Sequence, residues 1–307
     1  MGKYIIRRLL QMIPVILGST FLVYVMVFAL PGDPAQGRCG ERPCPPNYVE
    51  AFNREFNLDK PLLVQYGLYL GKLLQGDLGT NFYQNSVAHE LLIRYPTTVK
   101  LAVLAIIFEI VIGILAGVLA GIRKGSFMDN FVLVSTLLVI AMPVFVLGSL
   151  LQLVFGIKIP IFPVTSTNGT IRELILPAFV LGTISIAYVA RLTRANLAEN
   201  LRADYVRTAK AKGLTPTRTV AVHTLRNSLI PVITFIGADF GTLMGGAIVT
   251  ERIFNINGIG SFLFRSIRQQ DGQSVVGAIV VLIIVFLLFN LIVDILYGVL
   301  DPRISND

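Results

Sequence analysis

The 307-residue chain is far more apolar than a water-soluble domain of its length. Hydrophobic residues make up 54% of it, charged residues only 14%, and its mean hydropathy is +0.72. This composition excludes an ordinary soluble globular protein and predicts an all-α protein that crosses a membrane several times. The net charge of +8 gathers between apolar runs, so we attribute it to membrane topology and anionic headgroups rather than to nucleic-acid binding.

Sequence patterns typical of catalysis are absent. Neither His89 nor His223 belongs to a Glu-x-x-His or His-Glu-x-x-His pattern, and there are only two Cys. No Gly-x-x-x-x-Gly-Lys-[Ser/Thr] phosphate loop occurs, so we expect no ATP hydrolysis by that route on this chain. The absence of Gly-x-Ser-x-Gly and Gly-x-Gly-Asp disfavours an intramembrane hydrolase. We therefore expect no catalytic residue, no metal site and no cofactor in this chain.

The first apolar run, Leu9–Leu30, contains no charged residue and follows Lys3, Arg7 and Arg8. A cleavable signal peptide would have a shorter apolar region and a small-residue cleavage site. We therefore expect an uncleaved first span with the N-terminus in the cytoplasm. Residues 31–97 are polar, with Pro, Gly, Asn and Asp spread through them, which predicts a domain outside the cytoplasm.

This polar region contains two segments with helical periodicity, Asn47–Asn57 and Pro61–Gly76, and the turn Gly76-Asp-Leu-Gly79. Cys39 and Cys44 lie close together in a loop rich in proline. Because the compartment outside the cytoplasm is oxidising, we expect a disulfide between them. Two free thiols are the alternative.

Five more apolar runs predict five more spans. The second span contains one charge, Glu109, and the third is interrupted at Pro143, where neighbouring helices can satisfy the carbonyl groups that proline leaves free. Residues 158–173 and 251–272 then return to the outer side, the latter as a re-entrant or interfacial segment. The predicted spans after the first are 101–121, 131–157, 174–190, 228–250 and 274–293.

Six spans place both termini in the cytoplasm. Of the 26 Lys and Arg, 14 then lie on the N-terminus and the short inner segments, and the other 12 are spread over longer outer regions. This bias supports the orientation. The predicted division is residues 1–30, the N-terminus and first span; residues 31–97, the outer domain; and residues 98–307, a core of five spans.

The longest inner segment, residues 191–227, is strongly basic. It holds eight Lys or Arg against two acids, Glu199 and Asp204, and so carries +6 of the net +8. Such a segment is typical either of a docking site for a soluble partner or of a positive-inside anchor without a partner. Composition alone leaves both interpretations open.

Within this segment the pattern predicts a short amphipathic helix. Tyr205, Val206 and Ala209 share one face, and Arg207 and Lys210 occupy another. Gly213 can supply the positive-φ residue that ends the helix. Thr215 and Pro216 then predict the N-cap and first turn of a second helix that leads into the membrane.

Three acids lie in or next to the spans: Glu109, Asp239 and Asp294. Charges inside a membrane are costly and usually face the bundle interior or a cavity. They predict either a proton or cation relay or structural pairing, which suits Asp294 at the end of its span. We expect Asp239, with Glu109, to line a transport pathway. The small residues beside Asp239, which suit a flexible pathway or close helix packing, are Gly241, Gly245 and Gly246.

The basic segment resembles the cytoplasmic EAA loop of ABC-importer permeases, in the version of the dipeptide/oligopeptide/nickel group. The matching residues are Asp204-Tyr-Val-Arg-Thr-Ala-Lys-Ala-Lys-Gly-Leu214 and His223-Thr-Leu-Arg-Asn-Ser-Leu-Ile-Pro231. Arg207-Thr-Ala209 stands where the general pattern has Glu-Ala-Ala, and Leu225-Arg226 where it has Leu-Pro. These departures are similar to the peptide-group variant.

Further matches run along the whole chain and resemble the first permease of a pair. Each is weak alone, but their common order is specific; Cys39 and Cys44 are outside this pattern. The matches are Tyr4-Ile-Ile-Arg-Arg-Leu-Leu-Gln-Met-Ile-Pro14, Leu30-Pro-Gly-Asp-Pro34, Leu58-Asp-Lys-Pro61, Tyr66, Gly76-Asp-Leu-Gly79, Pro143-x-Phe145, Glu251-Arg-Ile-Phe254, Gly258-Ile-Gly260 and Asp301-Pro-Arg303.

The resemblance implies a type I importer fold in the cytoplasmic (inner) membrane. Two permeases would form the pathway, two cytoplasmic ATPases would bind ATP and Mg²⁺, and an external binding protein would deliver di- or oligopeptides. The helix ending at Gly213 would be the coupling helix, seated in a cleft of the ATPase. The residues implied to couple to the ATPase are Asp204, Tyr205, Arg207, Thr208, Ala209, Lys210, Ala211, Lys212, Gly213, Leu214, His223, Arg226 and Asn227.

Three alternatives accompany this prediction. A permease for nickel or another small solute belongs to the same family. A stand-alone, proton-coupled secondary transporter would use Glu109, Asp239 and Asp294, and an intramembrane enzyme is the third. A docking loop for an ATPase favours the importer subunit, because a stand-alone carrier has no need of one.

Overall fold

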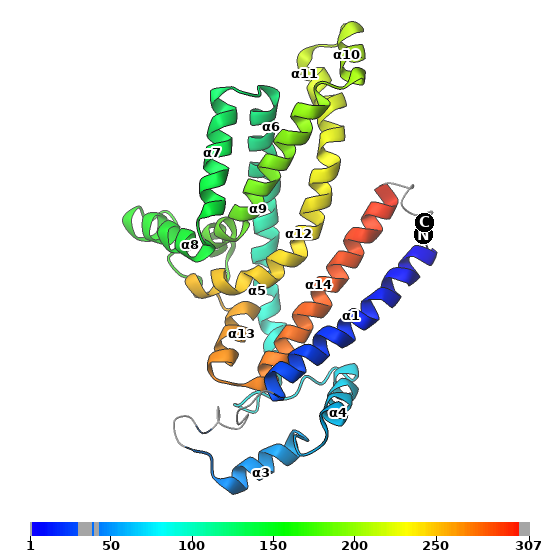
Figure 1. The fold of residues 1–307 in the computed structure, drawn as a ribbon. Coiled ribbons are helices and arrows are strands. Elements are labelled where there is room, and N and C mark those ends of the chain that lie inside the picture. Colours follow the sequence, from blue (N-terminus) through cyan, green and yellow to red (C-terminus); the bar gives the residue numbers. More distant parts are fainter. Residues whose placement is uncertain (1, 30–38, 40–42, 301–307) are drawn as a thin grey trace. The chain divides into compact units, whose positions relative to one another are not determined.

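The computed structural model describes residues 2–29, 39 and 43–300 of the chain (Figure 1). Within these residues the regular structure is helical, with three π-helical segments and one isolated β-bridge between Thr80 and Ser86. The predicted all-α class therefore holds for the part of the chain that is described.

The chain divides into two compact units. The terminal unit comprises Met1–Thr98 and Asn257–Asp307, and the central unit comprises Val99–Ile256. This division follows packing, whereas the division expected at residues 30 and 97 follows membrane topology. The two units are described separately below.

Five of the described helices are long and apolar enough to cross a membrane, and a bent helix pair makes a sixth span if it counts as one. The bent pair is Phe127–Ala141 and Val144–Lys158, whose axes differ by 105°. Pro143, where the sequence predicts an interruption, lies in the bend. The five long helices, each of which contains one predicted span wholly or in part, are Ile5–Phe28, Val87–Ile122, Ile171–Asn200, Pro216–Gly245 and Gly272–Ile295.

The terminal unit is built from helices near both ends of the chain. They are α1 (Gly2–Phe28), α3 (Pro46–Glu55), α4 (Leu62–Leu74), the first part of α5 (Val87–Phe108), α13 (Ile259–Arg268) and α14 (Gly272–Leu300). α1 and α14 lie side by side (Figure 1). Tyr24 of α1, Tyr69 of α4, and Val276 and Val280 of α14 form a buried cluster between them. Apolar and aromatic packing thus holds the two ends of the chain in one unit.

Helix α5 begins well before the second predicted span, which starts at residue 101. It starts at Val87 and carries two charged residues in its first turns. Arg94 pairs with Glu90 one turn earlier, and its guanidinium carbon lies 4.9 Å from the centre of the Phe262 ring. Because this pair neutralises itself and is mostly buried, the helix extends through residues that composition marks as polar. The long helix Val87–Ile122 thus contains the predicted span 101–121 and extends beyond its start.

The central unit is organised around one long helix, α9 (Ile171–Asn200), which contacts α6, α7, α8, η1 and α12. The other elements of the unit are the second part of α5, η1 (Glu109–Gly113), α6 (Ile114–Ile122), α7 (Phe127–Ala141), α8 (Val144–Gln152), η2 (Leu153–Lys158), α10 (Asp204–Ala211), α11 (Pro216–Arg218), η3 (Thr219–Thr224) and α12 (Leu225–Ile253). The three η elements are π-helical.

Three glycines spaced four residues apart let η1 and α6 approach α9 closely. A Cβ added at Gly117 would lie 2.5 Å from the carbonyl oxygen of Ala190, and one added at Gly121 would lie 3.1 Å from the Cβ of Leu197. Gly113 also faces α9, against Val189. This arrangement is the small-residue face by which membrane helices pack backbone against backbone. The sequence places such packing near Gly245, but a Cβ there would meet nothing within 4 Å.

Substitution of Gly117 tests this packing. We expect Gly117→Ala to lower the thermal unfolding midpoint of the chain in detergent, because overpacking a close contact costs about 1–3 kcal/mol. Gly245→Ala is the matched control, since it adds the same methyl group on a helix in open space. Equal midpoints for the two variants, measured by circular dichroism, would contradict the assignment.

Candidate functional site

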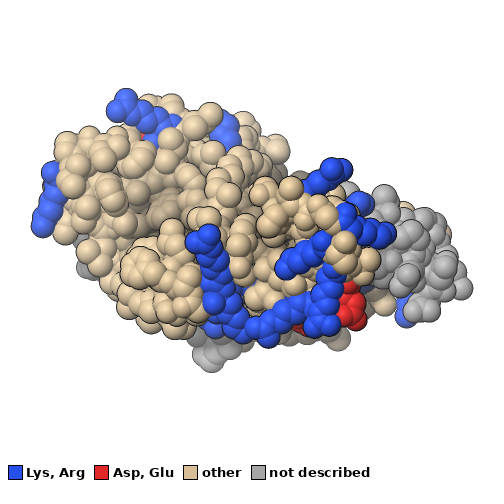
Figure 2. Space-filling view, turned by 90° about the horizontal axis from the view of Figure 1, so that it is seen from above, with Lys and Arg blue, Asp and Glu red and all other residues tan. Residues whose placement is uncertain are grey.

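The basic segment 191–227 is not one continuous loop. α9 continues to Asn200, so Arg191 and Arg194 lie on that helix, and α10, α11 and η3 follow before α12 begins at Leu225. Figure 2 looks onto the end that carries α10; blue basic side chains are spread over this face and acidic ones are few. Most of the expected positive charge therefore lies on helices, long and short, rather than on one continuous loop.

Helix α10 has an apolar and a polar face as predicted, except that Tyr205, which was expected on the apolar face, is exposed and donates its hydroxyl proton to Asn200. Val206 is fully buried and Ala209 is 8% exposed, and α10 packs against η3 of its own chain. Arg207 and Lys210 point away from this contact and are exposed. The apolar face of α10 is thus used inside the chain, and its polar face stays open for a partner.

Gly213 ends α10 in a left-handed conformation, with φ of +82°. Its N–H donates to the carbonyl of Lys210 (3.0 Å), and the N–H of Leu214 donates to the carbonyl of Ala209 (3.2 Å). These two bonds form a Schellman motif, which requires positive φ at the residue that glycine occupies here. The predicted role of Gly213 in ending this helix is confirmed.

The second helix of the segment starts as predicted. The Thr215 side chain accepts a hydrogen bond from the N–H of Arg218 (3.4 Å), and Pro216 occupies the first turn. The helix α11 is short, however, and passes directly into η3 and then α12. The Gly213 turn and the Thr215 cap together fix the angle at which the chain re-enters the long helix.

Hydrogen bonds connect the two long helices on either side of α10. The Asn200 amide nitrogen donates to Ser228 Oγ (3.1 Å), and Ser228 lies 3.4 Å from the carbonyl of Asn196 on α9. Tyr205 of α10 donates its hydroxyl proton to the Asn200 side-chain oxygen (3.0 Å). α10 is therefore attached to the junction of α9 and α12 and not merely suspended between them.

The exposure of the predicted coupling residues separates them into two groups. Ala209 is buried and Leu214 half-buried, so these two hold the segment together. The exposed residues, which form a polar surface that we call the α10 face, are Asp204, Tyr205, Arg207, Thr208, Lys210, Ala211, Lys212, Gly213, His223, Arg226 and Asn227. Two motifs of the resemblance, residues 30–34 and 301–303, lie outside the described residues.

An ion pair that the sequence did not reveal connects α9 and α7 in the central unit. The Arg194 guanidinium donates to both carboxylate oxygens of Asp129 on α7. Asp129 also accepts from the N–H of Gly125 in the α6–α7 turn (2.7 Å). The two residues are 65 positions apart, so neither spacing nor periodicity could pair them.

The three intramembrane acids differ in their surroundings. Asp294 pairs with Arg8 at 3.3 Å, in agreement with its predicted structural role. Asp239 accepts from Ser185 Oγ on α9 (2.5 Å) and from Thr242 Oγ1 on its own helix (2.5 Å). These two hydroxyl partners were not identified from the sequence, because no pattern marks a serine that faces an acid on another helix.

Glu109 is fully buried at the start of η1. Neither of its carboxylate oxygens has a hydrogen-bond partner among the described residues, and it interacts electrostatically with Asp239. Ile106 and Ile114, which flank Glu109 in the chain, pack in one apolar cluster with Val232 and Ile236 of α12, the helix that carries Asp239. Gly241 is buried and Gly245 exposed on the same helix as Asp239.

A disulfide joins Cys39 and Cys44, with their Cα atoms 5.4 Å apart. This is the pairing expected from the sequence. Cys44 lies just before α3, whose first residue is Pro46. The bridge closes a small loop, so we expect its contribution to stability to be about 2 kcal/mol or less.

The state of these cysteines can be tested by intact mass. We expect no labelling of the unreduced, unfolded chain by iodoacetamide, and two added groups after reduction, because both sulfurs are in the bridge. Material labelled before cell lysis controls for oxidation in air. Two labels on the unreduced sample would rule out the disulfide.

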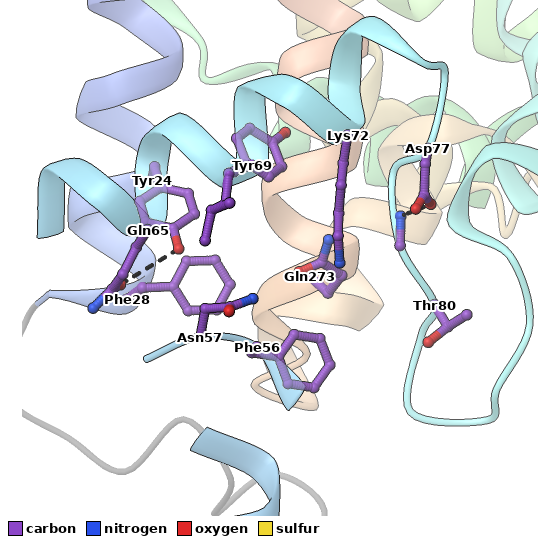
Figure 3. Close-up of a pocket in the computed structure, with 12 residues that line it drawn as sticks. Tyr24, Phe28, Phe56, Asn57, Gln65, Tyr69, Lys72, Asp77, Thr80 and Gln273 are labelled. Carbon is purple, nitrogen blue, oxygen red and sulfur yellow. Dashed lines mark hydrogen bonds between the residues drawn. The ribbon is translucent and has the colours of Figure 1, made fainter. Parts of the chain in front are cut away.

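The terminal unit contains a pocket of about 190 Å³ between α1, α4 and α14 (Figure 3). Tyr24 donates to Gln65 on its wall (3.4 Å), and Lys72 and Gln273 lie near each other at one side. Typical ligand pockets exceed about 300 Å³. Its lining contains aromatic rings, amides, the Lys72 ammonium group, the Asp77 carboxylate and the Thr80 hydroxyl, and we assign no catalytic role to it.

Comparison with known proteins identifies a family over the whole chain. Residues 113–306 match the family model described as binding-protein-dependent transport system inner membrane component, and residues 1–102 match the model of its N-terminal part.

The similarity to individual relatives covers nearly the full length of both chains. The di/tripeptide transport system permease of Pseudomonas aeruginosa is 40% identical, with 100% of this chain and 99% of the relative covered. The dipeptide transport system permease of Escherichia coli is 36% identical, with the same coverage. The glutathione transport system permease of Pectobacterium atrosepticum is 36% identical, with 99% of each chain covered.

Proposed function

The chain belongs to the family of binding-protein-dependent transport system inner membrane components, and we propose that it is one permease subunit of an ABC importer for di- and oligopeptides. The observation that carries the substrate class is the full-length similarity to permeases whose names specify dipeptides, di- and tripeptides, or glutathione. The substrates in these three names are all short peptides, which favours peptides over nickel or another small solute as the substrate.

We propose that the chain crosses the inner membrane six times, with the bent pair as one span and both termini in the cytoplasm. The 14 Lys and Arg on the inner segments support this orientation. In it, the polar region that contains α3, α4 and the Cys39–Cys44 disulfide lies outside the cytoplasm. An oxidising compartment is where such a bridge persists.

The α10 face is the proposed contact with a cytoplasmic ATPase. Three features support it: a net positive charge, a polar exposed surface, and rigid attachment to α9 and α12 through Asn200 and Ser228. A short helix held this way transmits a rigid-body displacement to two long helices at once. A flexible topology signal would need none of these contacts.

The other components follow from the family membership and from what this chain lacks. A second permease would complete the pathway, two ATPases would bind and hydrolyse ATP with Mg²⁺, and an external binding protein would supply the peptide. The sequence has no phosphate loop of its own.

The assembly itself can be tested by reconstitution. We expect the purified chain alone to show no ATPase activity and no peptide accumulation in proteoliposomes, and both to appear when a second permease, two ATPases and a binding protein are added. Accumulation by this chain alone, driven by a proton gradient, would instead establish the secondary transporter.

Gly213→Asp tests the α10 face. A side chain at positive φ costs roughly 1–2 kcal/mol, so the Schellman turn and the direction of α10 should be disturbed. We expect normal membrane insertion but loss of transport and of ATPase co-purification. Gly213→Asn has nearly the same shape and a similar tolerance of positive φ but no charge, so this variant separates the added negative charge from the backbone strain.

Gly76→Asp is the matched control for backbone strain. Gly76 has φ of +77° and open space around it, as Gly213 has, but it lies in the polar region of the terminal unit. It should leave ATPase co-purification unchanged. Wild-type ATPase retention by Gly213→Asp would leave the basic segment as a topology signal only.

A further inference from the structure

Three acidic side chains in the apolar helices are paired with arginine. Asp129 pairs with Arg194, and Asp294 with Arg8. Glu90, in the first turn of α5, likewise pairs with an arginine one turn later. This is the expected solution, because an uncompensated charge within a membrane is expensive.

Asp239 departs from this pattern. In the part of the chain that is described, no ion pair joins it to a Lys or Arg; its polar partners are two hydroxyl groups. Ser185 Oγ lies 2.5 Å from Oδ2, while Thr242 Oγ1 lies 2.5 Å from Oδ1 and 2.7 Å from the Asp239 carbonyl oxygen. A carboxylate has about four acceptor positions, so these contacts orient the group and leave acceptor capacity unused.

The neighbouring Glu109 is a second acid that no Lys or Arg pairs with among the described residues. It is fully buried, both of its carboxylate oxygens lack a partner among the described residues, and it interacts electrostatically with Asp239. Asp239 itself is half-buried and therefore accessible. A cation placed at Asp239 would offset the cost of that carboxylate.

We propose that Asp239, held by Ser185 and Thr242, binds the protonated α-amino group of the peptide as it crosses the membrane. The inference rests on the proposed peptide transport. An α-ammonium group is compact, carries three donors and is mostly charged at neutral pH, where the α-amino pKa is about 7.7–8.0. A metal ion is less suited, because no group of three His, Cys, Asp or Glu that could hold one exists among the described residues.

The site is tested without the binding protein, whose own selectivity would hide that of the permease. Saturation-transfer NMR on the detergent-solubilised permease–ATPase complex measures binding of a free-amine dipeptide and of the same dipeptide N-acetylated. In the wild type we expect a signal from the free amine and a weak one from the acetylated peptide. Asp239→Asn should weaken free-amine binding about tenfold, since a charged hydrogen bond is lost.

Two further variants make the test specific. Asp59→Asn, the same change at an exposed acid outside the apolar helices, should bind as the wild type does. Thr242→Val keeps the carboxylate but removes one of its hydroxyl partners at an exposed position, and should weaken binding several-fold. Thr242→Val also tests the site if the Asp239→Asn permease does not assemble with the ATPases.

The outcomes separate this inference from the proposed function. Equal binding of both peptides by the wild type, or unchanged free-amine binding in Asp239→Asn and Thr242→Val, would overturn the ammonium site. Unchanged binding in those variants beside normal peptide uptake by the reconstituted importer would leave the transport function standing. Absence of peptide uptake by the complete wild-type importer would reject the function itself.

Discussion

The compensation of charge and of backbone polarity inside an apolar medium is the constraint on which this structure depends. A bilayer offers no water to hydrogen-bond exposed backbone groups, so the spanning segments are helices. It offers no counter-ions either, and the chain supplies its own: Asp129 with Arg194, and Asp294 with Arg8. Removing one partner of a buried pair such as Asp129–Arg194 would leave a buried charge without compensation. Against this background the two hydroxyl groups around Asp239 are a different arrangement, one that orients a carboxylate without neutralising it.

Close packing follows from the same constraint. Lipid tails are as apolar as leucine, so helices in a membrane gain little from burying large side chains against one another and more from close backbone contact. The glycine face of η1 and α6 on α9 provides that contact, at Gly117 against the carbonyl of Ala190 in particular. α9 thereby becomes the element against which α6, α7, α8 and α12 are all placed. Its position in turn determines where Ser185 and Asn200 meet α12.

Local physics made part of this predictable from the sequence. The apolar runs, the bend at Pro143, and the left-handed residue at Gly213 follow from composition, from the missing N–H of proline and from the missing Cβ of glycine. Long-range pairing was not predictable: Arg194 meets Asp129 across 65 residues, and Ser185 meets Asp239 across 54. The extension of α5 back to Val87 was not predictable for the same reason, because Glu90 and Arg94 look like surface charges until Arg94 is known to lie over the ring of Phe262. The family resemblance supplied the role of α10, which amphipathicity alone left undecided.

The α10 face and the Asp239 site are both supported by α9 and α12. For the proposed importer, this arrangement links the two sites mechanically. α10 is fixed to the junction of α9 and α12 by Asn200 and Ser228, so a displacement imposed at the α10 face acts on both helices. The Ser185–Asp239 hydrogen bond spans the same two helices. Any sliding or tilting of α9 against α12 must therefore lengthen or reorient that bond, and a carboxylate that loses an orienting hydroxyl holds an ammonium less well. A single pair of helices can in this way connect movement of an ATPase to release of a bound amine, without a separate relay between them.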